Sequence, residues 1–122
     1  MTSPFEQLIP FLYTPDLEQT SRFYARTLGL PLVRDQGTCR IFRVAPSAYL
    51  GFCTHLDSPR PTGIILTLVS DDVDDWYKRL ISLGVEFIKP PTHNAQYRIY
   101  HCFFKDPNGY LLEIQRFDQP LE

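Results

Sequence analysis

The feature that most constrains this chain is an internal repeat of a helix start and a helix end. The first copy runs from Thr-Pro-Asp-Leu (14–17) to Leu-Gly-Leu (28–30), and the second from Ser-Asp-Asp-Val (70–73) to Leu-Gly-Val (83–85). A polar residue that can cap a helix opens each copy, and a glycine suited to a helix C-terminus closes it. A short apolar run precedes each helix and three follow it, so the order β-α-β-β-β occurs twice.

The repeat predicts an α+β fold in which two βαβββ repeats form a partly closed mixed sheet around a cavity. We expect residues 1–57 to form the first module, residues 58–63 a Pro-rich linker, and residues 64–122 the second module of one structural domain. The expected strands are short runs rich in apolar and β-branched residues. They are Leu8–Tyr13, Pro31–Arg34, Cys39–Val44, Tyr49–Thr54, Ile64–Val69, Val85–Ile88, Tyr97–Phe104 and Tyr110–Gln115.

Composition excludes several classes of partner. The net charge of −2 gives no basic surface for nucleic acid or anionic membranes. No apolar stretch approaches the roughly 20 residues of a membrane span, and the N-terminus does not resemble a signal peptide. The cysteines, Cys39, Cys53 and Cys102, are odd in number and lack a CxxC spacing. We therefore expect no disulfide framework and a reducing, cytoplasmic location.

The sequence Asp-Pro-Asn-Gly (106–109) predicts a hairpin that sets the register of two strands. A three-residue loop at 107–109 places Phe103 opposite Glu113 and His101 opposite Gln115. A two-residue loop would shift the pairing and move His101 away from the face of Glu113. With the longer loop, Glu113 and His101 share one face of the hairpin.

Glu113 is the best polar marker of a cavity in this chain. A carboxylate on the inner face of a strand needs a metal, a cation, water or a ligand. The alternative is that Glu113 faces solvent while Leu112 and Ile114 face the core. His101 beside Glu113 suggests metal binding or proton transfer, and a hydrogen-bonded structural histidine is the other interpretation.

The segments 13–24, 28–30 and 104–114, together with the repeated order of elements, resemble the vicinal oxygen chelate superfamily. This superfamily includes glyoxalase I, extradiol dioxygenases, fosfomycin-resistance enzymes and bleomycin-resistance proteins, and the resemblance spans roughly residues 8 to 116. It implies the paired βαβββ fold. A fold of this kind hosts many activities, so function has to be argued from the site.

In metal-dependent members of this superfamily, the first strand of each half usually supplies a ligand, often histidine. The matching positions here are Ile9 and Ile65, and the further position in the first half falls near Gly51 and Phe52. Only Glu113 matches a metal-ligand position of the family. We therefore expect no metal site and no cofactor; a divalent metal, with His101 as an unusual extra ligand, is the alternative.

The resemblance and the residues together predict a glyoxalase/bleomycin-resistance-like protein that binds a small, partly aromatic or anionic molecule without a metal. Arg40 and Arg43 lie at opposite strand parity, so one of them should point inward and meet an anionic group, whereas Trp76 on a helix face suits core packing. Short members of the superfamily often pair, so we expect a homodimer. The expected ligand-binding residues are Tyr13, Arg40, Phe42, Tyr97, His101, Phe103 and Glu113.

Three other functions remain open at this point. One is a metal-dependent lyase, isomerase or dioxygenase with a non-standard site, in which the ion polarises a substrate oxygen. Another is a metal-free catalyst, in which Glu113 and His101 are the best candidates for catalytic proton transfer. The last is an interaction domain without a small ligand. The sequence does not decide whether the protein is an enzyme.

Overall fold

A computed structural model describes residues 2–57 and 62–122 of the chain. The chain divides into two compact units, Met1–Arg60 and Pro61–Glu122, which we call the first and second module. The greater part of the predicted linker, residues 58–61, lies outside the described residues. Each module has the predicted β-α-β-β-β order.

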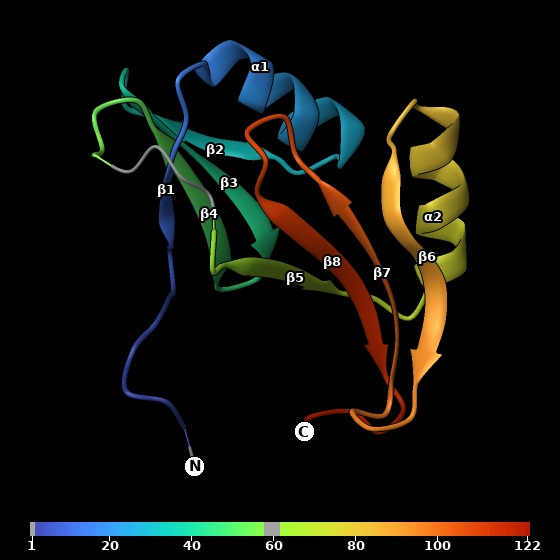
Figure 1. Cartoon of the computed structure of the whole chain (residues 1–122). Coiled ribbons are helices and arrows are strands. Elements are labelled where there is room, and N and C mark those ends of the chain that lie inside the picture. Colours follow the sequence, from blue (N-terminus) through green and yellow to red (C-terminus); the bar gives the residue numbers. More distant parts are fainter. Residues whose placement is uncertain (1, 58–61) are drawn as a thin grey trace. The chain divides into compact units, whose positions relative to one another are not determined.

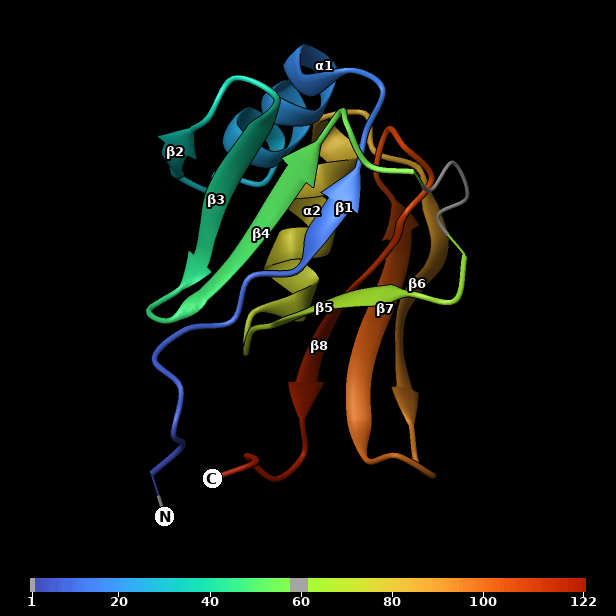
Figure 2. The ribbon, with the colours of Figure 1, turned by 90° about the vertical axis from the view of Figure 1, so that its left-hand side faces the viewer.

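The first module is a four-stranded mixed sheet with its helical segment against one face. Its strand order is β1-β4-β3-β2, which is visible in Figure 2. β1 runs parallel to β4, and the other neighbours are antiparallel. The elements are β1 (Phe11–Tyr13), α1 (Leu17–Ser21), the π-helical turn η1 (Arg22–Thr27), β2 (Leu32–Asp35), β3 (Cys39–Ala45) and β4 (Ala48–Cys53).

The second module repeats this arrangement. Its strand order is β5-β8-β7-β6, with β5 parallel to β8 and the other pairs antiparallel. The helix α2 lies along β6 in Figure 1 and also contacts β7 and β8. The elements are β5 (Ile65–Val69), α2 (Val73–Ser82), β6 (Phe87–Asn94), β7 (Ile99–Lys105) and β8 (Leu111–Phe117).

The first helix begins two residues later than a cap at Thr14 would place it. Asp16 is the N-cap, and its carboxylate accepts a hydrogen bond of 3.1 Å from the backbone N–H of Gln19. Thr14 instead accepts a bond from the N–H of Asp16 and shares a 2.8 Å bond with the hydroxyl of Thr20. Both side chains thus satisfy the free backbone donors at the helix entry.

The hairpin of the second module has the predicted three-residue loop. Asp106 pairs with Tyr110 through a backbone bond of 3.0 Å. Gly109 has a φ of +89°, the left-handed conformation that a glycine bulge requires. The carboxylate of Asp106 accepts bonds of 2.8 Å from the N–H groups of Asn108 and Tyr110. This turn fixes the register of β7 against β8.

The strand β6 is longer than predicted. We expected it to stop at Ile88 because Lys-Pro-Pro follows, but it continues to Asn94. β6 is the outer strand of its sheet, and its pairing with β7 shifts register between Lys89 and Thr92. Proline cannot donate to a ladder, so it is tolerated at an edge and at a bulge.

The cysteines also differ from expectation. Cys39 and Cys53 form a disulfide, and the buried Cys102 is the free cysteine of the described chain. Cys39 and Cys53 lie directly opposite each other on β3 and β4. The odd number of cysteines and the missing CxxC spacing had predicted no disulfide framework, but the pairing of β3 with β4 brings these two residues together. The cysteines therefore do not support the expected reducing, cytoplasmic location.

Each module has its own apolar core between sheet and helix. In the first module, Tyr24, Phe42 and Phe52 are fully buried, and the rings of Tyr24 and Phe52 lie 4.5 Å apart between centroids. In the second module, Leu80 of α2 and Phe104 of β7 are fully buried.

No helix within the described residues is long and apolar enough to cross a membrane.

Candidate functional site

The second module carries a hollow of about 570 Å³ on one face of its sheet. This volume lies within the usual range of small-molecule sites, roughly 300 to 1,000 Å³. All of the residues that line it belong to the second module. They are Ile65, Lys89, Asn94, Tyr97, Ile99, His101, Phe103, Glu113, Gln115 and Phe117. We call this feature the second-module hollow.

Strand alternation explains which side chains reach the hollow. In β7, Ile99, His101 and Phe103 project to the same face, and Glu113 and Gln115 of β8 join them. The residues between them project into the core beneath α2. The predicted register, with Phe103 opposite Glu113 and His101 opposite Gln115, is therefore confirmed.

Glu113 is the centre of a buried polar cluster. His101 Nδ1 lies 2.6 Å from one carboxylate oxygen, and the hydroxyl of Thr67 donates to the other at 2.7 Å. The amide of Gln115 lies 3.0 and 3.2 Å from the two oxygens when its nitrogen faces them. Glu113 is only 7% exposed and His101 only 4%. Three donors thus compensate for the burial of this carboxylate.

Within the same cluster, one polar atom has no partner. His101 Nε2 is buried and forms no hydrogen bond with any described residue. Buried polar atoms without a partner are rare, and a site for water or a ligand is a common reason. With Nδ1–H donating to Glu113, Nε2 can accept a hydrogen bond from a ligand when the ring is neutral. When the ring is protonated, Nε2–H donates to an anionic oxygen.

The rest of the hollow combines apolar walls with a few polar groups. The ring of Phe103 packs edge-on against His101, with 5.0 Å between the ring centroids. Tyr97 is exposed at the rim, and its backbone N–H donates to the side chain of Asn94. Lys89 is half-buried and brings a positive charge to the lining. A ligand there would meet aromatic rings, one amine and the free histidine nitrogen.

Three of the predicted ligand-binding residues lie in the first module, outside this hollow. Phe42 is fully buried between Tyr24 and Phe52, because its strand parity directs it under the helix. Tyr13 is half-buried on β1. Arg40 also faces the helix, so the structure corrects the expected placement of Phe42 and Arg40 in a cavity.

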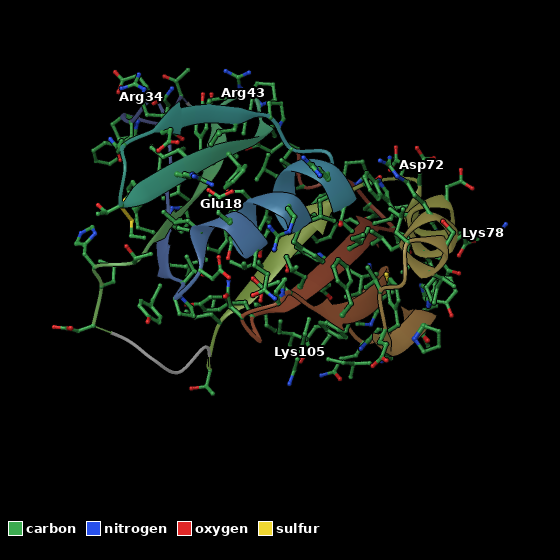
Figure 3. All side chains as sticks on the ribbon, turned by 90° about the horizontal axis from the view of Figure 1, so that it is seen from above. Glu18, Arg34, Arg43, Asp72, Lys78 and Lys105 are labelled. Carbon is green, nitrogen blue, oxygen red and sulfur yellow. A yellow bond between two sulfur atoms is a disulfide. The ribbon has the colours of Figure 1, made fainter. Side chains whose placement is uncertain are left out.

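Arg40 is held by the first module itself. Its guanidinium donates to Ser21 at 2.8 Å and forms an ion pair of 2.6 Å with Glu18, which Figure 3 shows on α1. The hydrogen bond to Glu18 raises the pKa of Arg40 above its usual value. The arginine of opposite parity, Arg43, lines a smaller hollow of about 320 Å³ together with Arg34.

Some residues of the site were not among the predicted ones. Thr67 interrupts the apolar run 64–69 at the parity that faces Glu113, and this break was the available signal. Lys89 and Asn94 were missed because β6 was expected to end at the prolines. Phe117 was missed because the last strand was expected to end at Gln115.

The residues around Glu113 do not form a set of metal ligands. Neither Ile9 nor Ile65 offers a donor side chain. A Cβ added at Gly51 would lie 2.4 Å from the ring of Phe11, so this position has no room for a ligand. A catalytic zinc or iron ion needs about three protein ligands. The donor set does not fit such an ion.

The comparison with protein families supports the fold and its order of elements. The model of the Glyoxalase/Bleomycin resistance protein/Dioxygenase superfamily matches residues 7–114. This range contains both helix motifs, the hairpin loop and Glu113.

Solved structures of the same architecture resemble the chain over nearly its whole length. A glyoxalase/bleomycin resistance protein/dioxygenase from Nocardioides is 24% identical, with a TM-score of 0.73 over 96% of this chain and 85% of that one. A lactoylglutathione lyase from Agrobacterium tumefaciens is 20% identical, with a TM-score of 0.75 and coverage of 93% and 95%. A glyoxalase-related enzyme from Fulvimarina pelagi is 19% identical, with a TM-score of 0.76 and coverage of 92% and 88%. At these identities the likeness concerns the fold.

Proposed function

Because the chain belongs to the Glyoxalase/Bleomycin resistance protein/Dioxygenase superfamily, we propose that it binds a small, partly aromatic molecule in the second-module hollow. The observation that carries this proposal is His101 Nε2, which is buried without a partner on a side chain that lines the hollow. The ligand supplies the missing hydrogen-bond partner through a hydroxyl or an acidic oxygen.

The walls of the hollow favour a flat, apolar ligand body. Phe103, Phe117 and Tyr97 bring three aromatic rings, and Ile65 and Ile99 bring aliphatic surface. Ile65 is about half exposed, so it has apolar area left to bury against a ligand. Aromatic rings pack well against one another in offset or edge-on geometry, which favours an aromatic ligand over a sugar.

The polar groups favour a single oxygen-bearing end on that ligand. Glu113 orients the ring of His101, so Nε2 stays in place before a ligand arrives. Lys89 adds a positive charge for an acidic group such as a carboxylate or phenolate. The pair also has the arrangement of a general base, in which Nε2 takes a proton from a bound hydroxyl and Glu113 stabilises the resulting imidazolium.

We propose that this binding requires no metal ion. The three donors to Glu113 already satisfy both of its oxygens, so the carboxylate has no need of a cation. Elemental analysis of protein purified without chelator tests this point. The proposal is contradicted if the wild type contains one ion per chain and the variant Glu113→Gln contains none.

Thermal shift followed by calorimetry tests the binding proposal. The probes are benzoic acids and phenols, with cyclohexanol as a non-aromatic comparison. A ligand of the native state raises the melting temperature. His101→Phe keeps the aromatic bulk and removes Nε2, so we expect the best acidic or phenolic probe to bind at least roughly tenfold more weakly, the cost of one buried hydrogen bond.

His93→Phe is the matched control for that variant. His93 is exposed on β6, pairs with Asp118 at 2.8 Å and does not line the hollow. Its replacement should leave binding unchanged. The proposal fails if no probe raises the melting temperature, or if His101→Phe binds the probe as tightly as the wild type does.

We further propose that the protein forms a homodimer. The edge strands β1 and β5 carry exposed apolar side chains, including Phe11, Ile65 and Val69. Exposed edges with apolar side chains are common sites of association. Light scattering coupled to size exclusion tests this directly, and a monomer across the accessible concentration range contradicts it.

A further inference from the structure

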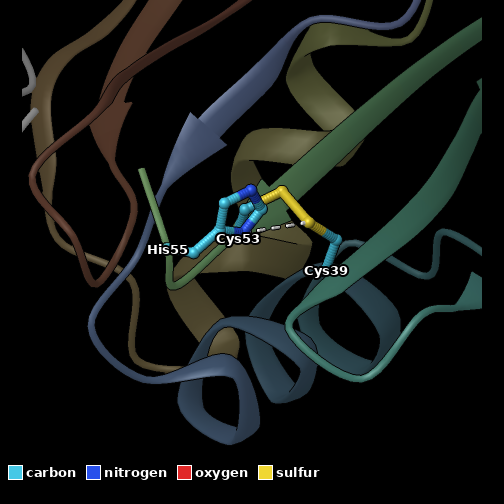
Figure 4. Close-up of side chains that lie close together, drawn as sticks. All are labelled: Cys39, Cys53 and His55. Carbon is cyan, nitrogen blue, oxygen red and sulfur yellow. Dashed lines mark hydrogen bonds between the residues drawn. A yellow bond between two sulfur atoms is a disulfide. The ribbon is translucent and has the colours of Figure 1, made fainter. Parts of the chain in front are cut away.

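A second chemically active group lies in the first module, where β3 begins beside the end of β4. Figure 4 shows Cys39, Cys53 and His55 together at this place. The two sulfurs form the disulfide, and His55 Nδ1 lies 3.8 Å from the sulfur of Cys39. The ligand atoms of all three side chains lie within 4.8 Å of one another. Among the described residues, this is the only group of three His, Cys, Asp or Glu side chains with that property.

The backbone holds the two cysteines in place independently of the bond between their sulfurs. Cys39 and Cys53 are paired across β3 and β4. The carbonyl of Cys39 accepts a bond of 2.8 Å from Gln36, and the carbonyl of Cys53 accepts one of 3.0 Å from Thr14. These bonds do not involve sulfur. Reduction therefore leaves two thiols facing each other on a fixed pair of strands.

We propose that the reduced pair, together with His55, forms a binding site for one zinc ion. Two thiolates and an imidazole are a common zinc ligand set, with water in the fourth tetrahedral position. A thiol reductant supplies the electrons: two RSH become RSSR while the protein disulfide becomes two thiols. Zinc then displaces the two thiol protons and forms two Zn–S bonds. The disulfide form has no thiolate to offer, so oxidation of the pair closes the site.

The two sulfur ligands of this site are buried, and the imidazole is its exposed member. Cys39 and Cys53 are 7% and 2% exposed, whereas His55 is exposed. His55 follows Cys53 by two residues, just beyond the end of β4, and its ring lies beside the disulfide. The imidazole beside the two sulfurs supplies a third ligand atom, which a cross-link alone does not use. The position of His55 is what favours a metal site over a purely structural bond.

This site is separate from the second-module hollow, so the two proposals can fail independently. The free thiol of Cys102 is a contrast within the same chain. It is fully buried, and burial raises its pKa to about 11. It belongs to no group of three potential ligands among the residues that the structure describes. Cys102 is therefore the matched control for the cysteines of the site.

Cobalt(II) is the probe, because a thiolate–cobalt bond gives a charge-transfer band in the near ultraviolet. The full chain is reduced with a phosphine, freed of reductant under nitrogen, and titrated with cobalt and then with zinc. We expect one cobalt ion per chain with thiolate bands, displaced by one equivalent of zinc. The oxidised protein should show no such band.

Variants separate the site from non-specific thiol binding. Cys53→Ser should abolish the band, and Cys102→Ser should leave it unchanged. His55→Ala should weaken cobalt binding at least about tenfold, the lower end of losses seen even for outer-shell partners. Circular dichroism of each reduced variant checks that it is folded. A reduced wild type without the band, a band that persists in Cys53→Ser, or an unchanged cobalt affinity in His55→Ala overturns the proposal.

Discussion

The two modules have the same topology but use the same positions for different purposes. In the first, β1 pairs with β4 so that Phe11 lies beside Gly51. In the second, β5 pairs with β8 in the same way, and Thr67 lies beside Glu113. The ring of Phe11 covers the place where a side chain at Gly51 would go. At this position the first module therefore has an aromatic ring, and the second module has a hydrogen-bonded carboxylate.

The difference continues two residues further along the last strand of each module. The first module has the pair Cys39 and Cys53 there, joined as a disulfide. The second has the pair His101 and Gln115, both directed to Glu113. The repeated fold therefore fixes where side chains meet, and the residue types decide whether the meeting point is a cross-link or a polar site.

The largest expected loss of stability comes from replacing Glu113, the centre of the buried polar cluster, with an apolar residue. Glu113→Leu leaves His101 and Thr67 without their shared acceptor. We expect it to lower the free energy of unfolding by about 3 to 5 kcal/mol, as for other buried pairs that lose one member. Urea unfolding monitored by circular dichroism gives this number.

The double variant His101→Leu/Glu113→Leu separates lost polar contacts from lost packing. Replacing both partners with apolar groups removes the unsatisfied nitrogen, so the double variant should be more stable than the sum of the single changes predicts. Strict additivity would mean that His101 and Glu113 do not interact in solution.

The corresponding change in the first module is reduction of its disulfide. The bridge closes a loop with a sequence separation of 14 residues, for which chain entropy predicts a stabilisation of about 3 kcal/mol. Urea unfolding with and without a phosphine reductant measures it, with Cys102→Ser as the background. If reduction leaves the unfolding midpoint unchanged, the strands alone hold the first module together.

Much of this architecture could be predicted, because it depends on local signals that the chain repeats. Helix caps, terminal glycines and apolar alternation identified both modules, and Asp-Pro-Asn-Gly (106–109) gave the register that puts His101 beside Glu113. The prolines after Lys89 led to a wrong prediction of where β6 ends, because a strand tolerates proline only at certain places in a sheet. The place of β6 at the edge of its sheet depends on how the other strands pair.

The first module was harder to read, because its side-chain partners come from non-local pairing. Arg40 and Arg43 could be assigned to opposite faces, but choosing the face required knowing where α1 lies. The Cys39–Cys53 bridge required the exact pairing of β3 with β4, and the short turn between those strands carries no strong register signal. Residues that act through such cross-strand pairs are the ones that sequence patterns do not resolve.

A direct exchange between the modules tests how far the comparison holds. Gly51→Glu places a carboxylate at the position equivalent to Glu113, where the ring of Phe11 leaves no space for it. We expect a loss of about 3 kcal/mol from overpacking and an unpaired charge. Phe11→Thr/Gly51→Glu recreates the Thr67–Glu113 pair and should recover part of that loss in the same urea assay. If the double variant is no more stable than Gly51→Glu, the equivalence of these positions is wrong.

The smallest expected effect on stability concerns the sheet face that the helix of each module covers. On this face Arg40 of the first module is paired with Phe52, and Cys102 at the equivalent position of the second module is paired with Ile114. The first module keeps a charged group there, while burial raises the pKa of the Cys102 thiol from 9.0 to about 11. Because the folded-state pKa is higher than the unfolded one, folding favours the protonated thiol. This stabilisation is complete below about pH 9 and is lost as the pH rises towards 11, a change of roughly 2 to 3 kcal/mol. Urea unfolding at pH values on both sides of 9 should show this decline in the wild type and a smaller one in Cys102→Ala; equal declines would show that the thiol is not the group responsible.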